Sequence, residues 1–316
     1  MKKLVVLTGP TAVGKTNLSI ELAKRINGEI ISADSIQVYK GMDVGSAKIT
    51  EDEMQGVKHY LIDVLEPTEE FNVFTFKQMA LEAMDEIYAK GKIPIIVGGT
   101  GFYIQSIVYD IDFEDRVVNE EYRKKLYDIL ENQGEEYLHN MLREVDEESA
   151  EKIHANNVKR VIRALEFHHD NNIKLSDHND EQRAKSSPYN FAYYVLFDDR
   201  DKLYVQIGKR VDDMLKNGLV EEVQGLLDAG IDPNSIAMQG IGYKEVVGYL
   251  MGKYTEDEMS RKIKTNTRHF AKRQLTWFKR EKTVDMIDLV QYDYNKERIL
   301  EHIEKDLYSK GITCKN

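Results

Sequence analysis

The stretch GPTAVGKT, which follows a short apolar run, restricts the possible folds more than any other part of this 316-residue sequence. It matches the pattern G-x-x-x-x-G-K-[ST], which requires a strand before the loop and a helix after it. Residues 4–7 (LVVL) predict a buried strand, and Leu18, Leu22 and Ile26 recur with helical spacing. Both requirements are met, so the N-terminus predicts a strand-loop-helix unit that binds a di- or triphosphate.

The glycines, the lysine and the last threonine of this loop each have a use in phosphate binding. The loop consists of Gly9, Pro10, Thr11, Ala12, Val13, Gly14, Lys15 and Thr16. The glycines let backbone N–H groups curl around phosphate oxygens, and the helix N-terminus adds partial positive charge. Lys15 supplies a point charge, and the Thr16 hydroxyl is a candidate Mg²⁺ ligand. The alternative is a tight turn without a ligand, and the motif leaves open which reaction follows.

Strands alternate with helical segments through much of the chain. Further strands are predicted at residues 29–32, 60–64, 93–97 and 192–197, and a helical stretch at 76–90. This alternation predicts an α/β fold with a mostly parallel, doubly wound sheet flanked by helices, and together with the loop motif it predicts a P-loop NTPase-like sheet. Residues 113–187 have a helical, polar and acidic pattern, so we expect a helical insertion domain there, within a core of residues 1–112 and 188–316. The part after Lys202 is predicted to be largely helical.

The composition indicates a cytoplasmic protein. No apolar run approaches the ~18 residues of a membrane helix, and the N-terminus lacks the pattern of a signal peptide. Cys314 is the single cysteine, which excludes an intramolecular disulfide and a cysteine-based zinc site. The histidines and methionines show no ligand-like spacing.

The net charge of −11 is unevenly distributed. Residues 261–282 carry nine Lys or Arg and one acid, whereas residues 110–152 carry fifteen acids and six bases. If 261–282 is one helix, an apolar stripe (Ile263, Phe270, Ala271, Trp277 and Phe278) lies apart from a basic face (Arg261, Lys264, Arg268, Lys272 and Lys279). Such a face suits contact with an RNA backbone. The alternative is a basic helix neutralised by the acidic insertion.

Two more segments end predicted strands at the edge where a parallel sheet binds ligands. Asp34 follows the second strand and is a candidate Mg²⁺ ligand, general base or helix N-cap. Gln37 suits a purine edge, or it is merely solvated. Thr100, in the run GGTG after residues 93–97, brings a hydroxyl to the same edge, although a plain turn explains its glycines equally well. The cations Arg123, Lys159, Arg160 and Arg163 are candidate phosphate contacts or solvated charges.

Several motifs together resemble the tRNA dimethylallyltransferase family, also called tRNA isopentenyltransferases. They are GPTAVGKT, ISADSIQVYKGMDVGSAK, PIIVGGTGFYI, NNVKRVIRALEF, KRVDDMLKNGLVEEV, MQGIGYKE and TRHFAKRQLTWFKRE, and they span nearly the whole chain. Because this sequence ends without the zinc finger that eukaryotic members often carry, it is similar to the bacterial type.

The resemblance implies roles for individual residues. Asp34 is expected to be the base for the exocyclic amine of adenine, Thr100 to lie near the reacting centre, and Arg210 to join Lys15 and Thr16 on the diphosphate. The residues expected to meet the tRNA are Asp34, Ser35, Ile36, Gln37, Thr100, Arg123, Lys159, Arg160, Val161, Ile162 and Arg163. Lys272 and Arg273 of the basic helix are expected to bind it as well.

The resemblance also implies the reaction, which is transfer of a dimethylallyl group from dimethylallyl diphosphate to the adenosine 3′ of the anticodon, with release of diphosphate. Mg²⁺ is the expected cofactor, the tRNA anticodon stem-loop the expected partner, and a monomer the expected state. The rival interpretations are a nucleotide or metabolite kinase using ATP, a prenyltransferase acting on free adenine nucleotides, and a non-catalytic RNA-binding switch.

Overall fold

The computed structural model describes residues 1–112, 119–281 and 283–314. The chain forms two compact units, one made of residues 1–108 with 188–316 and the other of residues 109–187. The smaller unit thus includes Tyr109 to Asp112, which the sequence analysis assigned to the core. Residues 113–118, at the predicted start of the insertion, and Lys282, at the end of the predicted basic helix, lie outside the described residues.

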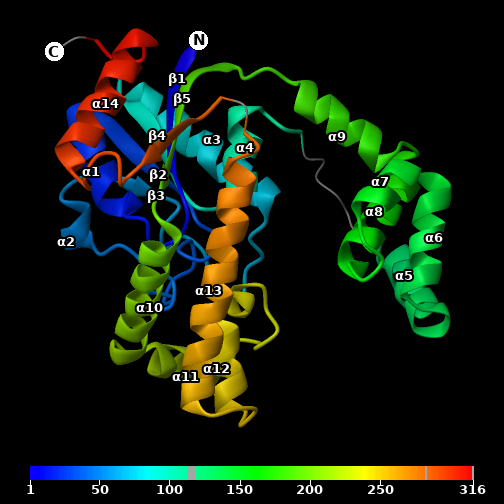
Figure 1. The fold of residues 1–316 in the computed structure, drawn as a ribbon. Helices are drawn as coiled ribbons and strands as arrows, with labels where there is room; N and C mark the ends of the chain where they lie inside the picture. The colour runs from blue at the N-terminus through cyan, green and yellow to red at the C-terminus, as the bar shows by residue number, and fades with distance from the viewer. Residues whose placement is uncertain (113–118, 282, 315–316) are drawn as a thin grey trace. The chain divides into compact units, whose positions relative to one another are not determined.

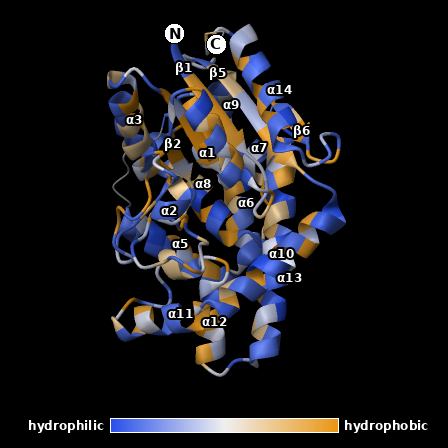
Figure 2. Ribbon diagram, turned by 90° about the vertical axis from the view of Figure 1, so that its left-hand side faces the viewer, coloured by the Kyte–Doolittle hydropathy of each residue, from blue (hydrophilic) through white to orange (hydrophobic). Residues whose placement is uncertain are grey.

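The larger unit is built on a six-stranded parallel sheet with the order β3-β2-β4-β1-β5-β6. The strands are β1 (Lys2–Thr8), β2 (Gly28–Ala33), β3 (His59–Tyr60), β4 (Ile93–Gly98), β5 (Tyr189–Phe197) and β6 (Asp285–Asp288). The central strands are apolar on both faces, as expected for a parallel sheet covered on both sides, and Figure 2 draws them mainly in orange. The predicted α/β fold is therefore confirmed.

Helices cover both faces of this sheet (Figure 1). On one face lie α1 (Lys15–Arg25) and α14 (Lys296–Ser309), whose apolar side chains share a core with Val5, Ile95 and Tyr194 of the strands. On the other lie α3 (Val73–Ala89) and α4 (Gly101–Val108). A short helix, α2 (Glu51–Met54), precedes β3. Because β1, β2 and β4 run parallel, their carboxyl ends lie together at one end of the sheet.

The remaining helices of this unit follow β5. They are α10 (Arg200–Lys216), α11 (Leu219–Asp228), the 3₁₀ turn η1 (Ala237–Gln239), α12 (Tyr243–Leu250) and α13 (Glu256–Phe278). The helices α10 and α13 pack side by side, and α12 packs against both α11 and α13 (Figure 1). Thr255 begins α13 with a capping box that includes Glu258. Helix α13 therefore begins five residues before the predicted basic helix and ends at Phe278.

The smaller unit is helical. It contains α5 (Glu120–Gln133), α6 (Glu135–Val145), α7 (Glu147–Lys152), α8 (Val158–Asn171) and α9 (Leu175–Ala184) around its own apolar core. Asp146, which is almost fully buried, accepts hydrogen bonds from the backbone N–H and hydroxyl groups of both Ser149 and Ser176. This carboxylate joins the starts of α7 and α9.

One predicted element was wrong in detail, and one strand was not predicted. The strand predicted at 60–64 is only His59–Tyr60, because Leu61 and Asp63 adopt left-handed backbone conformations with φ of 61° and 54°. The largely helical C-terminal part also contains β6, which pairs with β5. A four-residue strand is too short to show alternating hydrophobicity. No helix of the described residues is long and apolar enough to cross a membrane.

Candidate functional site

The loop between β1 and α1 has the backbone shape that its glycines predict. Gly9, Ala12 and Gly14 have positive φ values of 149°, 66° and 96°. A Cβ on Gly9 would lie 2.4 Å from the carbonyl oxygen of Leu196, so any other residue would collide with β5. Gly14 caps α1 without a side chain, which leaves the first N–H groups of the helix facing the loop.

Lys15 is held inside this loop. Its Nζ donates to the carbonyl oxygens of Gly9 and Pro10, at 2.9 and 2.8 Å. Burial and the charge of Arg210 lower the pKa of Lys15 to about 7, although Asp34 opposes this shift. Burial also lowers the pKa of Arg210, again against Asp34. Two cations are thus kept close together beside one carboxylate, an arrangement that an added anion would stabilise.

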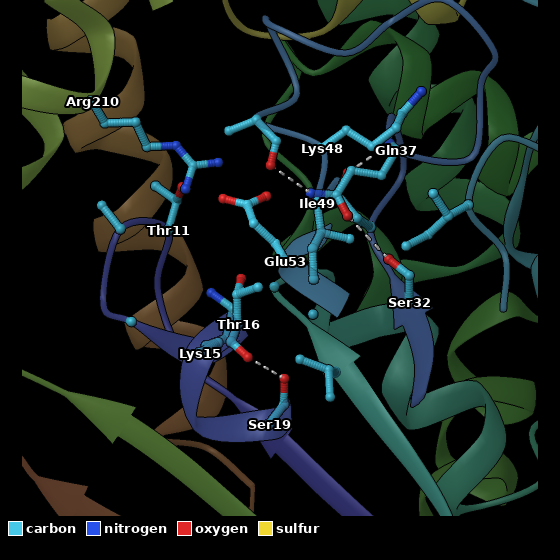
Figure 3. Close-up of a pocket in the computed structure, with 18 of the residues that line it drawn as sticks. Thr11, Lys15, Thr16, Ser19, Ser32, Gln37, Lys48, Ile49, Glu53 and Arg210 are labelled. Carbon is cyan, nitrogen blue, oxygen red and sulfur yellow. Dashed lines mark hydrogen bonds between the residues drawn. The ribbon is translucent and has the colours of Figure 1, made fainter. Parts of the chain in front are cut away.

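The loop contributes to a cavity of about 720 Å³ within the larger unit. The predicted residues that line it are Thr11, Ala12, Gly14, Lys15, Thr16, Asp34, Gln37 and Arg210. Figure 3 shows Lys15 and Thr16 at the start of α1, Gln37 on the loop after β2, and Arg210 extending from α10. Val13 is instead buried in the core beneath the loop. The strand ends and α10 therefore bring Lys15, Thr16, Arg210 and the predicted base Asp34 into one cavity, whereas Gly9, Pro10 and Thr100 are not among the residues that line it.

Asp34 caps a turn, and not a helix. Its Oδ1 accepts hydrogen bonds from the backbone N–H groups of Ile36 and Gln37, at 2.9 and 3.2 Å. Its Oδ2 accepts none from the residues that the structure describes. One oxygen therefore fixes the orientation of the carboxylate, and the other remains available for a proton or a ligand.

Thr100 lies next to Asp34 through the backbone. Its N–H donates to the carbonyl oxygen of Ala33 at 3.3 Å, and its own carbonyl oxygen accepts from Tyr103 and Ile104 at the start of α4. Pairing of β2 with β4 places Ala33 opposite Gly98 and brings these two strand ends together. The structure thus brings Asp34 and Thr100 to the same point of the sheet edge.

Gln37 is neither free nor simply solvated. Its Nε2 donates to the carbonyl oxygens of Ser46 and Ala47, both at 3.3 Å, and its Oε1 accepts from the Ser32 hydroxyl at 3.5 Å. The donor group is therefore directed at the 46–47 loop. Contact with a purine edge requires this side chain to share its donors or to change its partners.

Close packing accounts for the glycines around Thr100. A Cβ on Gly98 would lie 2.3 Å from the Ala33 carbonyl oxygen, and one on Gly101 would lie 2.3 Å from the Trp277 ring. Gln274 of α13, which sequence reasoning missed, accepts from Thr11 N–H and donates to the Gly99 carbonyl, each at 2.9 Å. A buried glutamine thus joins the phosphate-binding loop to the loop after β4.

Helix α13 has an apolar face and a basic face as predicted, but some residues of each face differ from the prediction in burial or in their contacts. Ile263, Ala271 and Phe278 are buried, whereas Phe270 and Trp277 are only partly buried, and Phe270 lines the cavity. On the basic face, Arg261, Lys272, Arg273 and Lys279 are exposed. Lys264 instead forms an ion pair with Asp212 of α10 at 2.5 Å, and the Arg268 guanidinium lies over the Tyr204 ring. The exposed cations remain candidates for a nucleic-acid backbone.

In the smaller unit the residues predicted to contact tRNA fall into three groups. Lys159, Arg160 and Arg163 of α8 are exposed. Val161 and Ile162 are buried in the core of this unit, which corrects the expectation that their side chains meet tRNA. Arg123 forms a two-point ion pair with Glu166, at 2.6 and 3.1 Å. This pair raises the pKa of Arg123 and fixes α5 against α8.

A metal ion at this site would depend on few protein ligands. Among the described residues, no group of three or more His, Cys, Asp or Glu could hold a metal. Thr16 and Asp34 nevertheless bring a hydroxyl and a carboxylate to the same cavity. Mg²⁺ prefers oxygen ligands and keeps several waters when it is bound to a phosphate substrate. The residues present therefore fit a Mg²⁺ ion that arrives with a diphosphate.

The fold and the cavity define a P-loop NTPase-like protein of the α/β class. Residues 37–281 match the family model for IPP transferase. The chain belongs to this family. It is 55% identical to the tRNA dimethylallyltransferase of Lachnoclostridium phytofermentans and 50% identical to that of Acetivibrio thermocellus, with 99% of each chain covered in both comparisons.

Solved structures agree with this assignment. The tRNA isopentenylpyrophosphate transferase of Bacillus halodurans is 42% identical, with a TM-score of 0.73 and 98% of each chain covered. A eukaryotic dimethylallyltransferase acting on tRNA is 31% identical and has a TM-score of 0.81, with 98% of this chain and 80% of that one covered. The resemblance read from the motifs is therefore confirmed at the level of sequence family and fold.

Proposed function

We propose that this chain is a tRNA dimethylallyltransferase, which transfers the dimethylallyl group of dimethylallyl diphosphate to the exocyclic amine of the adenosine 3′ of the anticodon. The observation that carries the proposal is a single cavity holding two cations, Lys15 and Arg210, beside a carboxylate, Asp34, whose second oxygen is available. The cations suit a diphosphate leaving group, and the carboxylate suits an amine that must lose a proton. We also propose that the chain acts in the cytoplasm, as a monomer.

The loop residues stabilise the charge that develops on the leaving group. When the C1–O bond of the allylic diphosphate breaks, both electrons stay on the diphosphate oxygen. Lys15, Arg210 and the N–H groups at the start of α1 are fixed in position before this happens, so little reorganisation is needed. Mg²⁺ held through Thr16 supplies further positive charge when it is bound.

Asp34 acts on the other substrate. The lone pair of an adenine amine is delocalised into the ring, so attack on the allylic carbon is helped when a base accepts a proton as the C–N bond forms. The Oδ2 atom of Asp34 is assigned this proton. The target base has to leave its stack to enter the cavity, at a cost of a few kcal/mol. The exposed cations on α8 and α13 are assigned to the phosphates of the tRNA.

The test is an incubation of the purified protein with Mg²⁺ and unmodified tRNA, with either dimethylallyl diphosphate or γ-labelled ATP. Mass spectrometry of the tRNA nucleosides is expected to show one added dimethylallyl group on an adenosine beside the anticodon, together with released diphosphate. Transfer of label from ATP to an acceptor, without any prenylated nucleoside, would establish a kinase instead.

A further inference from the structure

The carboxylate of Glu222 holds the loop that forms one wall of the cavity. Glu222 lies in the first turn of α11, and its Oε2 accepts from the N–H groups of Asp43 and Val44 at 2.8 and 2.7 Å. Its Oε1 accepts from Gly45 N–H at 3.0 Å and from the Tyr243 hydroxyl at 2.7 Å. Four donors from two other segments thus converge on one side chain, whereas a glutamate on the surface can have its carboxylate hydrogen-bonded by water.

The loop that Glu222 holds contacts groups on both sides of the proposed reaction. Asp43, Val44, Ala47 and Lys48 line the cavity. The Ser46 carbonyl oxygen accepts from Gln37 Nε2 at 3.3 Å, on the side of the proposed base, and from Arg210 Nη2 at 3.4 Å, on the side of the proposed diphosphate. The conformation of this loop therefore determines where two of the site's side chains lie.

Packing restricts the loop to the same conformation. A Cβ on Gly45 would lie 2.5 Å from the ring of Tyr243, which is itself fully buried. The ring thus fits directly against the glycine backbone while its hydroxyl reaches Glu222. Burial and the neighbouring Glu222 raise the pKa of Tyr243, so the phenol keeps its proton and remains a donor.

We propose that Glu222 is a positioning residue for prenyl transfer. It acts through the 43–47 loop, which aligns Gln37 and Arg210 with each other across the cavity. This proposal rests on the proposed function for its effect on activity. Because a displacement of about 1 Å can lower a rate by about 10²-fold, Glu222→Ala is expected to lower kcat by about 10- to 100-fold. The KM for dimethylallyl diphosphate should rise less than kcat falls, since a displaced loop moves Arg210 but leaves the hydrogen bonds of Lys15 in place.

The experiment compares Glu222→Ala, Glu222→Gln and the matched control Glu221→Ala, which alters the exposed neighbouring acid. Hydrogen exchange without substrate, followed over residues 42–48, tests whether Glu222 holds the loop. Exchange of the amides at 43–45 should accelerate in Glu222→Ala and remain as in wild type in Glu221→Ala. Glu222→Gln keeps an acceptor oxygen for part of the loop, so it should restore much of both the protection and kcat.

The outcomes separate the two proposals. A wild-type protein that prenylates no tRNA contradicts the proposed function, and the exchange data still decide whether Glu222 holds the loop. A folded Glu222→Ala protein with the kcat of wild type would overturn the positioning role. The role would also be overturned if Glu222→Gln lost as much Tm and as much kcat as Glu222→Ala. If Glu222→Ala does not fold, Tyr243→Phe removes one of the four donors and keeps the ring against Gly45. A kcat identical to wild type in both Tyr243→Phe and Glu222→Gln then overturns the proposal.

Discussion

Asp34 and Asp146 are two aspartates that accept hydrogen bonds from nearby N–H groups, one in each compact unit, and they differ in what happens to the second oxygen. Both oxygens of Asp146 are used, by Ser149 and Ser176. Only Oδ1 of Asp34 is used by the described residues, and the side chain lines the cavity. A fully satisfied carboxylate stabilises a fold, whereas a half-satisfied one at a strand end retains the capacity to bind or accept a proton.

The pKa of Asp146 supports this contrast. Burial by itself would raise that pKa, but the hydrogen bonds from Ser149 and Ser176 outweigh burial and lower it. The ionised form is thus built into the native smaller unit. In the larger unit the pKa of Lys15 is strongly lowered, and this shift comes from burial and from another cation, Arg210. The charge of Lys15, which lies beside another cation, belongs to the candidate site, whereas the charge of Asp146, which its hydrogen bonds stabilise, belongs to the fold of the smaller unit.

The largest effect is expected at Asp34. Asp34→Ala should lower turnover by roughly 10²- to 10⁴-fold, because the amine loses its base, and tRNA affinity should stay nearly intact. Single-turnover prenyl transfer together with tRNA binding measures both quantities. Asp34→Asn is the matched control, since it keeps an acceptor for Ile36 and Gln37 but cannot take a proton. If the asparagine variant retains the wild-type rate, Asp34 is not the base.

Asp146→Ala is expected to affect stability and not chemistry. Removal of this buried carboxylate leaves hydroxyl and N–H groups of two serines without an acceptor, which should cost about 3 kcal/mol in the stability of the smaller unit. Hydrogen exchange over residues 146–176 of the full chain measures this cost, with the exposed Glu147→Ala as control. A larger loss of stability in Asp34→Ala than in Asp146→Ala would reverse the comparison.

The sequence predicted the parts of the site that local patterns encode. The loop from Gly9 to Thr16, the strand end at Asp34 and the run around Thr100 all follow from short motifs and strand periodicity. Parallel strands then bring their carboxyl ends together without further information. The α/β fold and the end of the sheet that carries the cavity therefore follow from the sequence alone.

Contacts between distant segments could not be predicted in this way. Gln274 reaches Thr11 and Gly99 from a helix more than 170 residues away in the chain, and Glu222 reaches residues 43–45 across a similar separation. Both lie within motifs of the family resemblance, yet nothing in a single sequence pairs them with their partners. Likewise, Val161 and Ile162 were grouped with their basic neighbours, although the helical period turns them into the core.

Diphosphate binding should depend on pH through Lys15, because its charge in the free protein is not compensated as that of Asp146 is. Because its pKa in the folded protein is about 7, the lysine is mostly neutral at pH 8, and a bound anion should restore its proton. Binding of inorganic diphosphate at pH 8 should therefore take up a proton, and its affinity should fall by up to about tenfold per pH unit above pH 7. Calorimetry in buffers of different ionisation enthalpy measures the uptake. In Lys15→Met, the part of the proton uptake that comes from the Lys15 side chain should be lost.

The same lysine should influence folding in the opposite direction from an ordinary surface lysine. Its folded-state pKa lies below the unfolded value of 10.5, so the unfolded chain binds more protons between about pH 7 and 10.5. The contribution of Lys15 to the free energy of unfolding without ligand should therefore rise with pH across that interval. Urea denaturation of the wild type and Lys15→Met at pH 7 and 9 tests the sign, and a contribution that falls with pH would contradict the lowered pKa.

The smallest effect is expected for the exposed cations of α13. Lys272 and Arg273 are solvated in the free protein, so their contribution comes from displaced counterions and not from a perturbed site. Changing both to Ala should weaken tRNA binding and flatten the plot of log K against log salt by up to about two units of slope, while kcat at saturating tRNA stays unchanged. Binding titrations at several salt concentrations measure this slope. The matched control changes Lys296 and Lys305, two exposed lysines of α14, and should leave the slope as in wild type. An unchanged slope in the α13 variant would remove Lys272 and Arg273 from the RNA interface and leave the other exposed cations of α13 and those of α8 as candidates.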